Sequence, residues 1–373
     1  MSVADEKGQG AELFVPGRLC LFGEHSDWAA EHGLHPGYCL VIGTDQGLSA
    51  SARPSDRFTV ESLVPDKDGR PTGRTRQMAC EWDAETLRAT AKDENEFFRY
   101  CAGTAYQMHS HFSAPGGIDL RITSMDLPLR KGVSSSAAVC ILVAEAFNAV
   151  YRLGLFPHEM MEAAYRGEKL TGSQCGRMDQ ACIYGKTPVL LTFQKAVPPR
   201  IEPVFPAGQI DMFFVDLAGK KDTVKILDDL QAAYLHDRGL QQALGAENER
   251  IVRAAYLALT NGDPEELGSR MSEAQENFDR HIAPRSADEL AGPLLHRLLA
   301  FDEIAEHVYG GKGVGSQGDG TAQFVARSGE DRTAAMAKIA AGFPQMQCFP
   351  LNIWRLAKSE PAGESRPGRP LSL

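Results

Sequence analysis

The chain lacks several features that would assign it to a membrane or nucleic-acid-binding class. It has no run of about 20 apolar residues able to span a bilayer, and Met1–Gly10 has no apolar stretch of the secretory signal type. Basic residues are in the minority, with 39 Lys and Arg against 49 Asp and Glu, and the formal net charge is -10. Because nucleic-acid phosphates attract basic surfaces, we expect a cytoplasmic protein with no membrane and no nucleic-acid partner.

Paired cysteine motifs are missing as well. The eight cysteines are scattered and include no Cys-x2-Cys pair, so we expect reduced packing residues and no structural zinc.

Hydrophobic residues make up 43% of the 373 positions, and this length predicts two domains. We expect them at 1–200 and 201–358, followed by a polar, Pro- and Gly-rich tail, 359–373, that is disordered.

The segment Pro128–Ala138 (Pro-Leu-Arg-Lys-Gly-Val-Ser-Ser-Ser-Ala-Ala) predicts a phosphate-binding turn. Gly132 allows the backbone to bend after an expected strand at Ile118–Ile122, and three serines then offer hydroxyls and free amides at a helix start. The helix, expected from about Ser135 to Leu153, is apolar on nearly every face and should be buried. Its N-terminal dipole would favour a polyphosphate. A serine-capped core helix without a ligand is the alternative.

A second motif, Val15–Trp28, places polar residues at the end of an apolar strand. Arg18–Phe22 reads as this strand, and Gly23 breaks it into a loop that carries Glu24, His25, Ser26 and Asp27. Polar groups gathered at the end of a buried strand commonly face a ligand. His25 can equally be a structural histidine, and Trp28 can pack in the core or stack on a ligand.

Two carboxylates follow the expected buried helix. Pro157 predicts the first turn of another helix, which runs to about Leu170 and brings Glu168 near its end. A loop then leads to Asp179. Phosphoryl transfer from a nucleotide requires one carboxylate for magnesium and another for the proton of the acceptor hydroxyl, and these two residues suit the two roles. A cap or a salt bridge on its own helix is the alternative for Glu168.

These motifs resemble those of the GHMP small-molecule kinases. Pro128–Ala138 is similar to their Pro-x3-Gly-Leu-Ser/Gly-Ser-Ser-Ala pattern, with Val133 in place of the common Leu. Val15–Trp28 resembles the galactokinase motif Pro-Gly-Arg-x4-Gly-Glu-His-Thr-Asp-Tyr, and Cys175–Gln180 also looks like galactokinase. The glycine-rich stretch Gly310–Phe324 departs from the family, because Gln317, Asp319 and Thr321 replace small residues or glycine. For this stretch a turn without ligand contact is the alternative.

The resemblance implies an α+β fold with two domains. The N-terminal domain would hold a mixed sheet and the buried helix, the C-terminal domain would be ferredoxin-like, and the active site would lie in the cleft between them. The implied cofactors are ATP and Mg2+. The implied reaction is transfer of the γ-phosphate to a sugar or sugar phosphate, most specifically to its anomeric hydroxyl.

The resemblance also implies residue roles. Asp179 and Arg18 would be catalytic and would flank the acceptor oxygen. The substrate-binding residues would be Glu24, His25, Asp27 and Asp179. The ATP phosphates would contact Lys131, Gly132, Val133, Ser134, Ser135, Ser136 and Ala137. The magnesium ligands would be Ser136 and Glu168.

Several alternatives stay open. The sugar can be a hexose, a uronic acid, or a heptose- or octose-type sugar phosphate whose second phosphate is held by Arg130, Lys131 or Arg177. A non-sugar alcohol such as mevalonate is another acceptor, although mevalonate kinases carry Lys at the position of Arg18 and no aspartate at that of Asp27. A non-catalytic sugar and ATP sensor is a third reading. The sequence does not predict an oligomeric state.

The remaining chain predicts alternating elements. Helices are expected at Glu94–Met108, Thr223–Tyr234, Asn248–Thr260, Pro264–Phe278 and Pro293–Tyr309. Strands are expected at Cys39–Ile42, Leu48–Ala52, Gln209–Leu217, Ala322–Ala326 and Gln347–Ile353.

Overall fold

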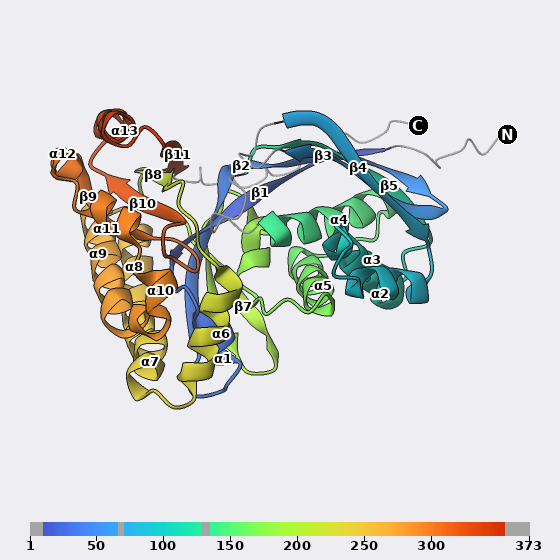
Figure 1. The fold of residues 1–373 in the computed structure, drawn as a ribbon, viewed down its shortest axis with the longest axis horizontal. Coiled ribbons are helices and arrows are strands. Elements are labelled where there is room, and N and C mark those ends of the chain that lie inside the picture. The colour runs from blue at the N-terminus through green and yellow to red at the C-terminus, as the bar shows by residue number, and fades with distance from the viewer. Residues whose placement is uncertain (1–9, 66–70, 128–134, 355–373) are drawn as a thin grey trace, which may run out of the picture.

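The computed structural model describes residues 10–65, 71–127 and 135–354, which form two β-sheets with helices packed against them (Figure 1). The first sheet has seven strands in the order β4-β3-β5-β2-β6-β7, and β1 pairs with β2 outside this path. The second sheet has four strands in the order β11-β8-β10-β9. The predicted α+β fold class is confirmed.

The first sheet is mixed, because β3 and β5 are parallel while the other pairs are antiparallel. Its strands are β1 (Ala11–Phe22), β2 (Gly37–Ser55), β3 (Arg57–Pro65), β4 (Pro71–Glu81), β5 (Gly117–Met125), β6 (Val189–Gln194) and β7 (Val197–Pro203). The two short strands predicted at Cys39–Ile42 and Leu48–Ala52 are parts of one long strand, β2. Irregular pairing with β1 between Pro16 and Arg18 allows this strand to continue without a turn.

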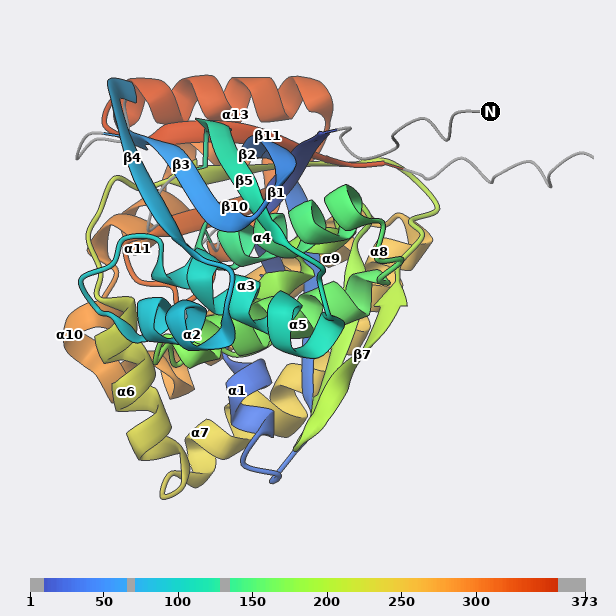
Figure 2. The same cartoon turned by 90° about the vertical axis from the view of Figure 1, so that its right-hand side faces the viewer.

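Helices cover one face of the first sheet (Figures 1 and 2). They are α2 (Ala84–Lys92), α3 (Arg99–Phe112), α4 (Ser135–Tyr151) and α5 (Pro157–Leu170). As predicted, α4 is buried along most of its length, because its side chains are apolar on every side. Phe147 packs on Phe58 of β3, with 5.9 Å between ring centroids. The predicted helix at Glu94–Met108 begins later, at Arg99, because Asp93–Phe98 forms turns instead.

Helices α3 and α5 cross in close contact. A Cβ at Gly103 would clash with the backbone of Gly167, and a Cβ at Gly167 would clash with Thr104. Glycine is therefore required at both positions for the helices to approach this closely. The crossing fixes the C-terminal half of α5, where Glu168 lies.

The second sheet is antiparallel and consists of β8 (Ile210–Asp216), β9 (Val308–Gly313), β10 (Thr321–Ala326) and β11 (Gln347–Ile353). Numbered along the chain, its strands lie in the order 4-1-3-2, which is the ferredoxin-like arrangement that we predicted. The change from the first sheet to the second falls between β7 and β8. The predicted division at 200 and 201 lies within β7 and stays a prediction.

The second half of the described chain also contains helices. They are α6 (Thr223–Tyr234), α7 (Arg238–Gln242), the π-helix η2 (Ala243–Glu247), α8 (Asn248–Asn261), α9 (Pro264–His281), the 3₁₀ helix η3 (Ala283–Ser286), α10 (Ala287–Leu290), α11 (Pro293–Leu299), α12 (Asp302–Ala305) and α13 (Gly329–Gly342). The predicted helix Pro293–Tyr309 is wrong: it divides into α11 and α12, and its end enters β9. Within the described residues, no helix has the length and apolarity to cross a membrane.

All eight cysteines lie in the described residues and are free thiols. Six of them are buried, and the two others, Cys175 and Cys348, are partly buried. The prediction of reduced packing cysteines is thus confirmed. The predicted disordered tail, 359–373, falls outside the described residues.

Candidate active site

Residues predicted from three distant segments converge where β1 ends. Arg18 lies in β1, and its guanidinium donates to the carboxylate of Asp179, the first residue of the 3₁₀ helix η1 (Asp179–Tyr184). The Arg18 side chain is 3% exposed, whereas that of Asp179 is 27% exposed. The guanidinium is therefore enclosed by the core, and the carboxylate remains open to a ligand.

Asp27 lies beside this pair, in the short helix α1 (Ser26–Ala30). Its Oδ2 atom accepts a hydrogen bond of 3.2 Å from the backbone N–H of Met178, the residue before Asp179. Gly176 is required here, because a Cβ at this position would clash with the Asp27 carboxylate. Burial raises the pKa of Asp27 to about 6, and the nearby Asp179 adds to the effect.

Glu168 and Ser136 meet at the N-terminal end of α4. The hydroxyl of Ser136 donates to Oε1 of Glu168 at 2.9 Å, and Gln180 donates from Nε2 to Oε2 at 2.8 Å. Burial raises the pKa of Glu168 to about 7, with Asp179 contributing. The structure thus brings the two predicted magnesium ligands together next to the Asp179 segment. Among the described residues the Glu168 side chain bonds to other segments of the chain and forms no salt bridge, so the alternative of a cap or salt bridge on its own helix is not supported.

Glu24 has a partner that the sequence did not predict. Its carboxylate pairs with the ammonium of Lys312 in β9, and both side chains are buried, at 5% and 1% exposed. Lys312 also donates to the carbonyl of Gly313 at 2.7 Å. The pair joins the loop after β1 to the second sheet. A single lysine within the run Gly310–Gly315 was the only indication of it in the sequence.

His25 is held by its neighbours. Trp28 donates from Nε1 to His25 Nδ1 at 3.0 Å, and the histidine backbone is left-handed, with φ of 68°. Burial lowers the pKa of His25 to about 4, and Lys221 lowers it further, so the ring is neutral near pH 7. Trp28 packs in an apolar cluster with Tyr234 at 5.5 Å between ring centroids. Its packing role is the one that the structure supports.

The glycine-rich loop between β9 and β10 contains two of the three residues that depart from the family pattern, and the third, Thr321, begins β10. Asp319 accepts from the backbone N–H groups of Leu294 and Leu295 at 2.8 and 3.0 Å. Its carboxylate therefore caps α11 and stabilises the helix start. Gln317 has a left-handed backbone, with φ of 61°, and its carbonyl accepts from Lys221 Nζ at 2.8 Å.

Arg177 was one of three candidates for holding a second phosphate. Its guanidinium pairs with Glu31 and, at 3.2 Å, with Glu162, and it lies over the ring of Tyr165 at 4.1 Å. Two carboxylates already satisfy this cation, so it does not offer a free phosphate site. Arg130 and Lys131 lie outside the described residues.

Part of the predicted phosphate-binding turn also lies outside the described residues, namely Lys131, Gly132, Val133 and Ser134. Ser135 and Ser136 form the first turn of α4, and Ala137 is buried behind them. Among the described residues no group of three or more His, Cys, Asp or Glu forms a metal site. Mg2+ takes few protein ligands and completes its shell with phosphate oxygens and water. One serine hydroxyl and one carboxylate at a helix start fit that ion.

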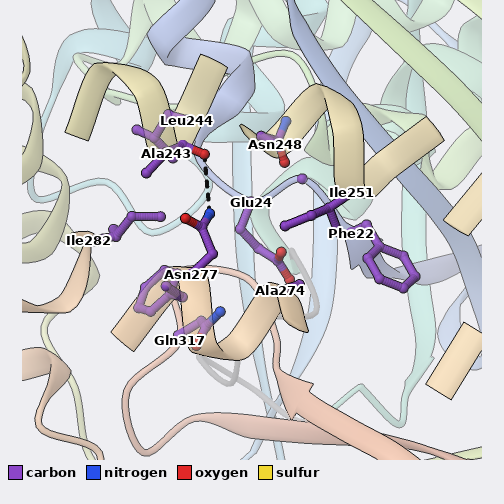
Figure 3. A pocket seen from close by; sticks show the side chains of 12 residues that line it. Phe22, Glu24, Ala243, Leu244, Asn248, Ile251, Ala274, Asn277, Ile282 and Gln317 are labelled. Carbon is purple, nitrogen blue, oxygen red and sulfur yellow. Dashed lines mark hydrogen bonds between the residues drawn. The ribbon is translucent and has the colours of Figure 1, made fainter. Parts of the chain in front are cut away.

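A small cavity adjoins Glu24 on the side of the second-half helices (Figure 3). It is lined by Phe22, Gly23, Glu24, Ala243, Leu244, Asn248, Ile251, Ala274, Asn277, Phe278, Ile282 and Gln317. Its walls thus come from β1, the loop after it, η2, α8, α9 and the glycine-rich loop.

Comparisons with known proteins match part of the chain to one family. Residues 99–186 match the family described as "GHMP kinases N terminal domain". A galactokinase from Roseiflexus sp. (strain RS-1) is 26% identical over 174 residues, which are 46% of this chain and 40% of that protein. The alignment therefore spans less than half of either chain.

Solved structures share the fold over most of the chain. Lactococcus lactis galactokinase complexed with galactose has a TM-score of 0.70 at 17% identity and is matched over 92% of this chain and 93% of its own. L. major mevalonate kinase in complex with R-mevalonate has a TM-score of 0.67 at 17% identity, over 96% and 100%. The resemblance predicted from the motifs is confirmed.

Proposed function

We propose that this chain, which belongs to the GHMP kinase superfamily, is an ATP- and Mg2+-dependent sugar kinase. The acceptor that we propose is the anomeric hydroxyl of the sugar. The observation that carries the proposal is the Arg18–Asp179 pair, in which an open carboxylate meets a buried guanidinium beside Asp27. This arrangement can bind, orient and deprotonate an alcohol.

The proposed acceptor hydroxyl lies beside the Arg18–Asp179 pair, against the open side of the Asp179 carboxylate. Its oxygen attacks the γ-phosphorus of ATP, an oxygen–phosphorus bond forms, and the bond to the β,γ-bridging oxygen breaks so that ADP leaves with the electron pair. The hydroxyl proton passes to the Asp179 carboxylate. Arg18 stabilises the negative charge that develops on the attacking oxygen. No phosphoenzyme is formed, because positioning and charge stabilisation suffice for such a transfer.

The nucleotide phosphates would be held at the start of α4. Ser136 and Glu168 would hold Mg2+, which, when bound, neutralises charge on the β- and γ-phosphates. The N-terminal dipole of a buried helix also favours anions. Gln180, which donates to Glu168, would keep that carboxylate oriented toward the phosphates.

A sugar is favoured over other alcohols by the loop after β1. Glu24 and His25 lie within it, Asp27 follows in α1, and the two carboxylates offer oxygens that accept hydrogen bonds from hydroxyl groups. The similarity to galactokinases supports the same class. A free sugar is favoured over a sugar phosphate to the extent that Arg177 is already paired with two carboxylates.

Turnover on a panel of acceptors tests the proposal. The purified chain would be incubated with ATP and Mg2+ against free hexoses, pentoses, uronic acids, sugar phosphates and mevalonate, and ADP release would be measured. We expect turnover with a free sugar and a product whose phosphorus NMR coupling places the phosphate on C1. Tight binding of sugar and ATP without turnover on any acceptor would instead indicate a sensor. Turnover with mevalonate alone would contradict the sugar assignment.

A further inference from the structure

The cavity beside Glu24 combines apolar walls with a few polar groups (Figure 3). It has a volume of about 20 Å³ open to the centres of water-sized groups, and roughly 10–15 Å³ is what one such group needs. Asn277 uses its Nδ2 atom to donate to the carbonyl of Ala243 at 3.2 Å. The cavity therefore has space for one small polar group. The Asn277 amide nitrogen at its wall is already bonded to the Ala243 carbonyl.

Gln317 lines this cavity with an unsatisfied amide. The residue is 1% exposed, and its Oε1 atom has no hydrogen-bond partner among the described residues. Buried polar atoms are nearly always paired in folded proteins, so this atom calls for a partner that the described residues do not supply. A bound group that donates to Oε1 would supply this partner.

The backbone of Gln317 is also unusual. A non-glycine residue in the left-handed region costs free energy, and such conformations gather at ligand-binding positions. Two contacts hold this one: the N–H donates to Val314 at 3.1 Å, and the carbonyl accepts from Lys221 at 2.8 Å. The loop thus holds the backbone of a residue whose side-chain Oε1 atom has no hydrogen-bond partner in the part of the chain that the structure describes.

Glu24 borders the same cavity and limits what it accepts. Its carboxylate is held by Lys312, so it is a fixed hydrogen-bond acceptor at the cavity wall. A hydroxyl group can donate to the Glu24 carboxylate and accept from the N–H of the Gln317 amide. It can also donate to the Gln317 oxygen if the amide is turned the other way. A carboxylate or phosphate would be repelled by Glu24 and is too large for the space.

We propose that Gln317 is a specificity-determining residue which, with Glu24, binds one uncharged hydroxyl group of the acceptor at a carbon that does not react. The inference rests on the proposed function and narrows it. It selects neutral sugars over uronic acids and sugar phosphates that carry their charge at that carbon. It also gives a role to a residue at which the chain departs from the family pattern.

The experiment compares kcat/KM for the best free sugar with its monodeoxy analogues, each lacking one non-reacting hydroxyl. In the wild-type chain one analogue should be strongly impaired. In Gln317→Met, which keeps the length of the side chain but not its hydrogen bonds, the parent sugar should lose about 10-fold in kcat/KM. For the analogue that was impaired in the wild type, kcat/KM should be almost the same in Gln317→Met as in the wild type. The ratio of kcat/KM for the parent sugar to that for this analogue therefore falls by the same factor of about 10.

Two further variants keep the test interpretable. Gln317→Glu retains a hydrogen-bond acceptor but adds a negative charge beside Glu24. It should lower kcat/KM for the parent sugar more than for the analogue. Gln107→Met is the matched control, because Gln107 is also a buried glutamine whose Oε1 has no partner among the described residues. It lies in α3, outside the cavity, and should leave the preference for the parent sugar unchanged. Melting temperatures of all three variants report folding separately.

The outcomes separate this inference from the proposed function. If the wild type phosphorylates sugars but Gln317→Met lowers kcat/KM by the same factor for the parent sugar and for every analogue, the specificity role is overturned. The kinase assignment then still stands. The same conclusion follows if Gln107→Met changes the preference as much as Gln317→Met. If the wild type phosphorylates no sugar at all, both proposals fall together.

Discussion

Two ion pairs link residues near the end of β1 to distant parts of the chain, and they differ in whether the carboxylate is exposed. In Arg18–Asp179 the cation is 3% exposed and the carboxylate 27% exposed. In Glu24–Lys312 the values are 5% for the carboxylate and 1% for the cation. The carboxylate of the first pair is open to solvent, whereas the second pair is buried and its carboxylate borders only the small cavity beside Glu24.

The difference suggests two uses of the same chemistry. An open carboxylate next to a fixed cation can exchange a proton with a bound hydroxyl. A closed pair cannot reach the reacting atoms, but it fixes the loop after β1 against β9 in the other sheet. We therefore expect substitutions in the first pair to reduce turnover most and substitutions in the second to reduce stability most.

Lys312→Met should have the largest effect on stability. It leaves the Glu24 carboxylate buried without its cation, and breaking such a pair costs about 3–5 kcal/mol. Urea unfolding would measure the loss. The control is Lys338→Met, because Lys338 pairs with the exposed Glu306 at 3.0 Å and its loss should cost under about 1 kcal/mol.

A double variant sharpens this prediction. Adding Glu24→Gln to Lys312→Met removes the unpaired charge, so part of the lost stability should return. Equal losses in Lys312→Met and Lys338→Met would show that the closed pair does not hold the two halves together.

Arg18→Met should reduce turnover by about 10²- to 10³-fold, because one group that stabilises the developing charge is removed. Initial rates of ADP release at saturating ATP and sugar would measure it. Arg121→Met provides the control, since Arg121 pairs with Glu61 on the exposed face of the sheet and is 66% exposed itself. A loss of less than about 10-fold in Arg18→Met would contradict a catalytic role.

Asp27→Asn tests the electrostatics beside the open pair. The folded-state pKa of Asp27, about 6, lies above its ordinary value of 3.8. Its contribution to stability is therefore complete below about pH 4 and is lost as the pH rises to about 6. The asparagine variant lacks this loss, so its unfolding free energy should gain up to about 3 kcal/mol relative to wild type between these pH values. A difference that stays constant with pH would show that the carboxyl has an ordinary pKa.

Arg177→Met should have the smallest effect. Its pairs with Glu31 and Glu162 are partly exposed, so we expect a loss of about 1 kcal/mol in thermal or urea unfolding. The ratio of turnover on free sugars to turnover on sugar phosphates should not change. A selective loss of activity on phosphorylated sugars would show that Arg177 binds a second phosphate after all.

Local sequence signals predicted the elements that carry the residues proposed to bind phosphate and metal. Pro157 and Leu170 bound α5 as predicted, and Gly154, with φ of 70°, follows α4. These signals act within one or two helical turns, so they can be read from the chain. The strand at Gln347–Ile353 was also predicted with its observed bounds.

Contacts between residues far apart in the sequence could not be predicted from local patterns. Glu24 and Lys312 are 288 positions apart, and neither residue type indicates the other. The apolar spacing of Pro293–Tyr309 suggested one helix, but its end pairs with β10 as β9, since tertiary pairing outweighs local preference. Gln317 was recognised as a departure from the family pattern, yet only the folded loop shows that its amide lines a cavity.

The most direct test of the account is a rapid-quench measurement of phosphoryl transfer by Asp179→Asn at saturating ATP and sugar. Asparagine keeps a hydrogen-bond acceptor for Arg18 but cannot take the proton of the acceptor hydroxyl. We predict that the single-turnover rate falls by about 10²- to 10⁴-fold while the affinity for ATP is unchanged. Transfer at the wild-type rate would contradict the assignment of Asp179 and Arg18 to the reacting oxygen.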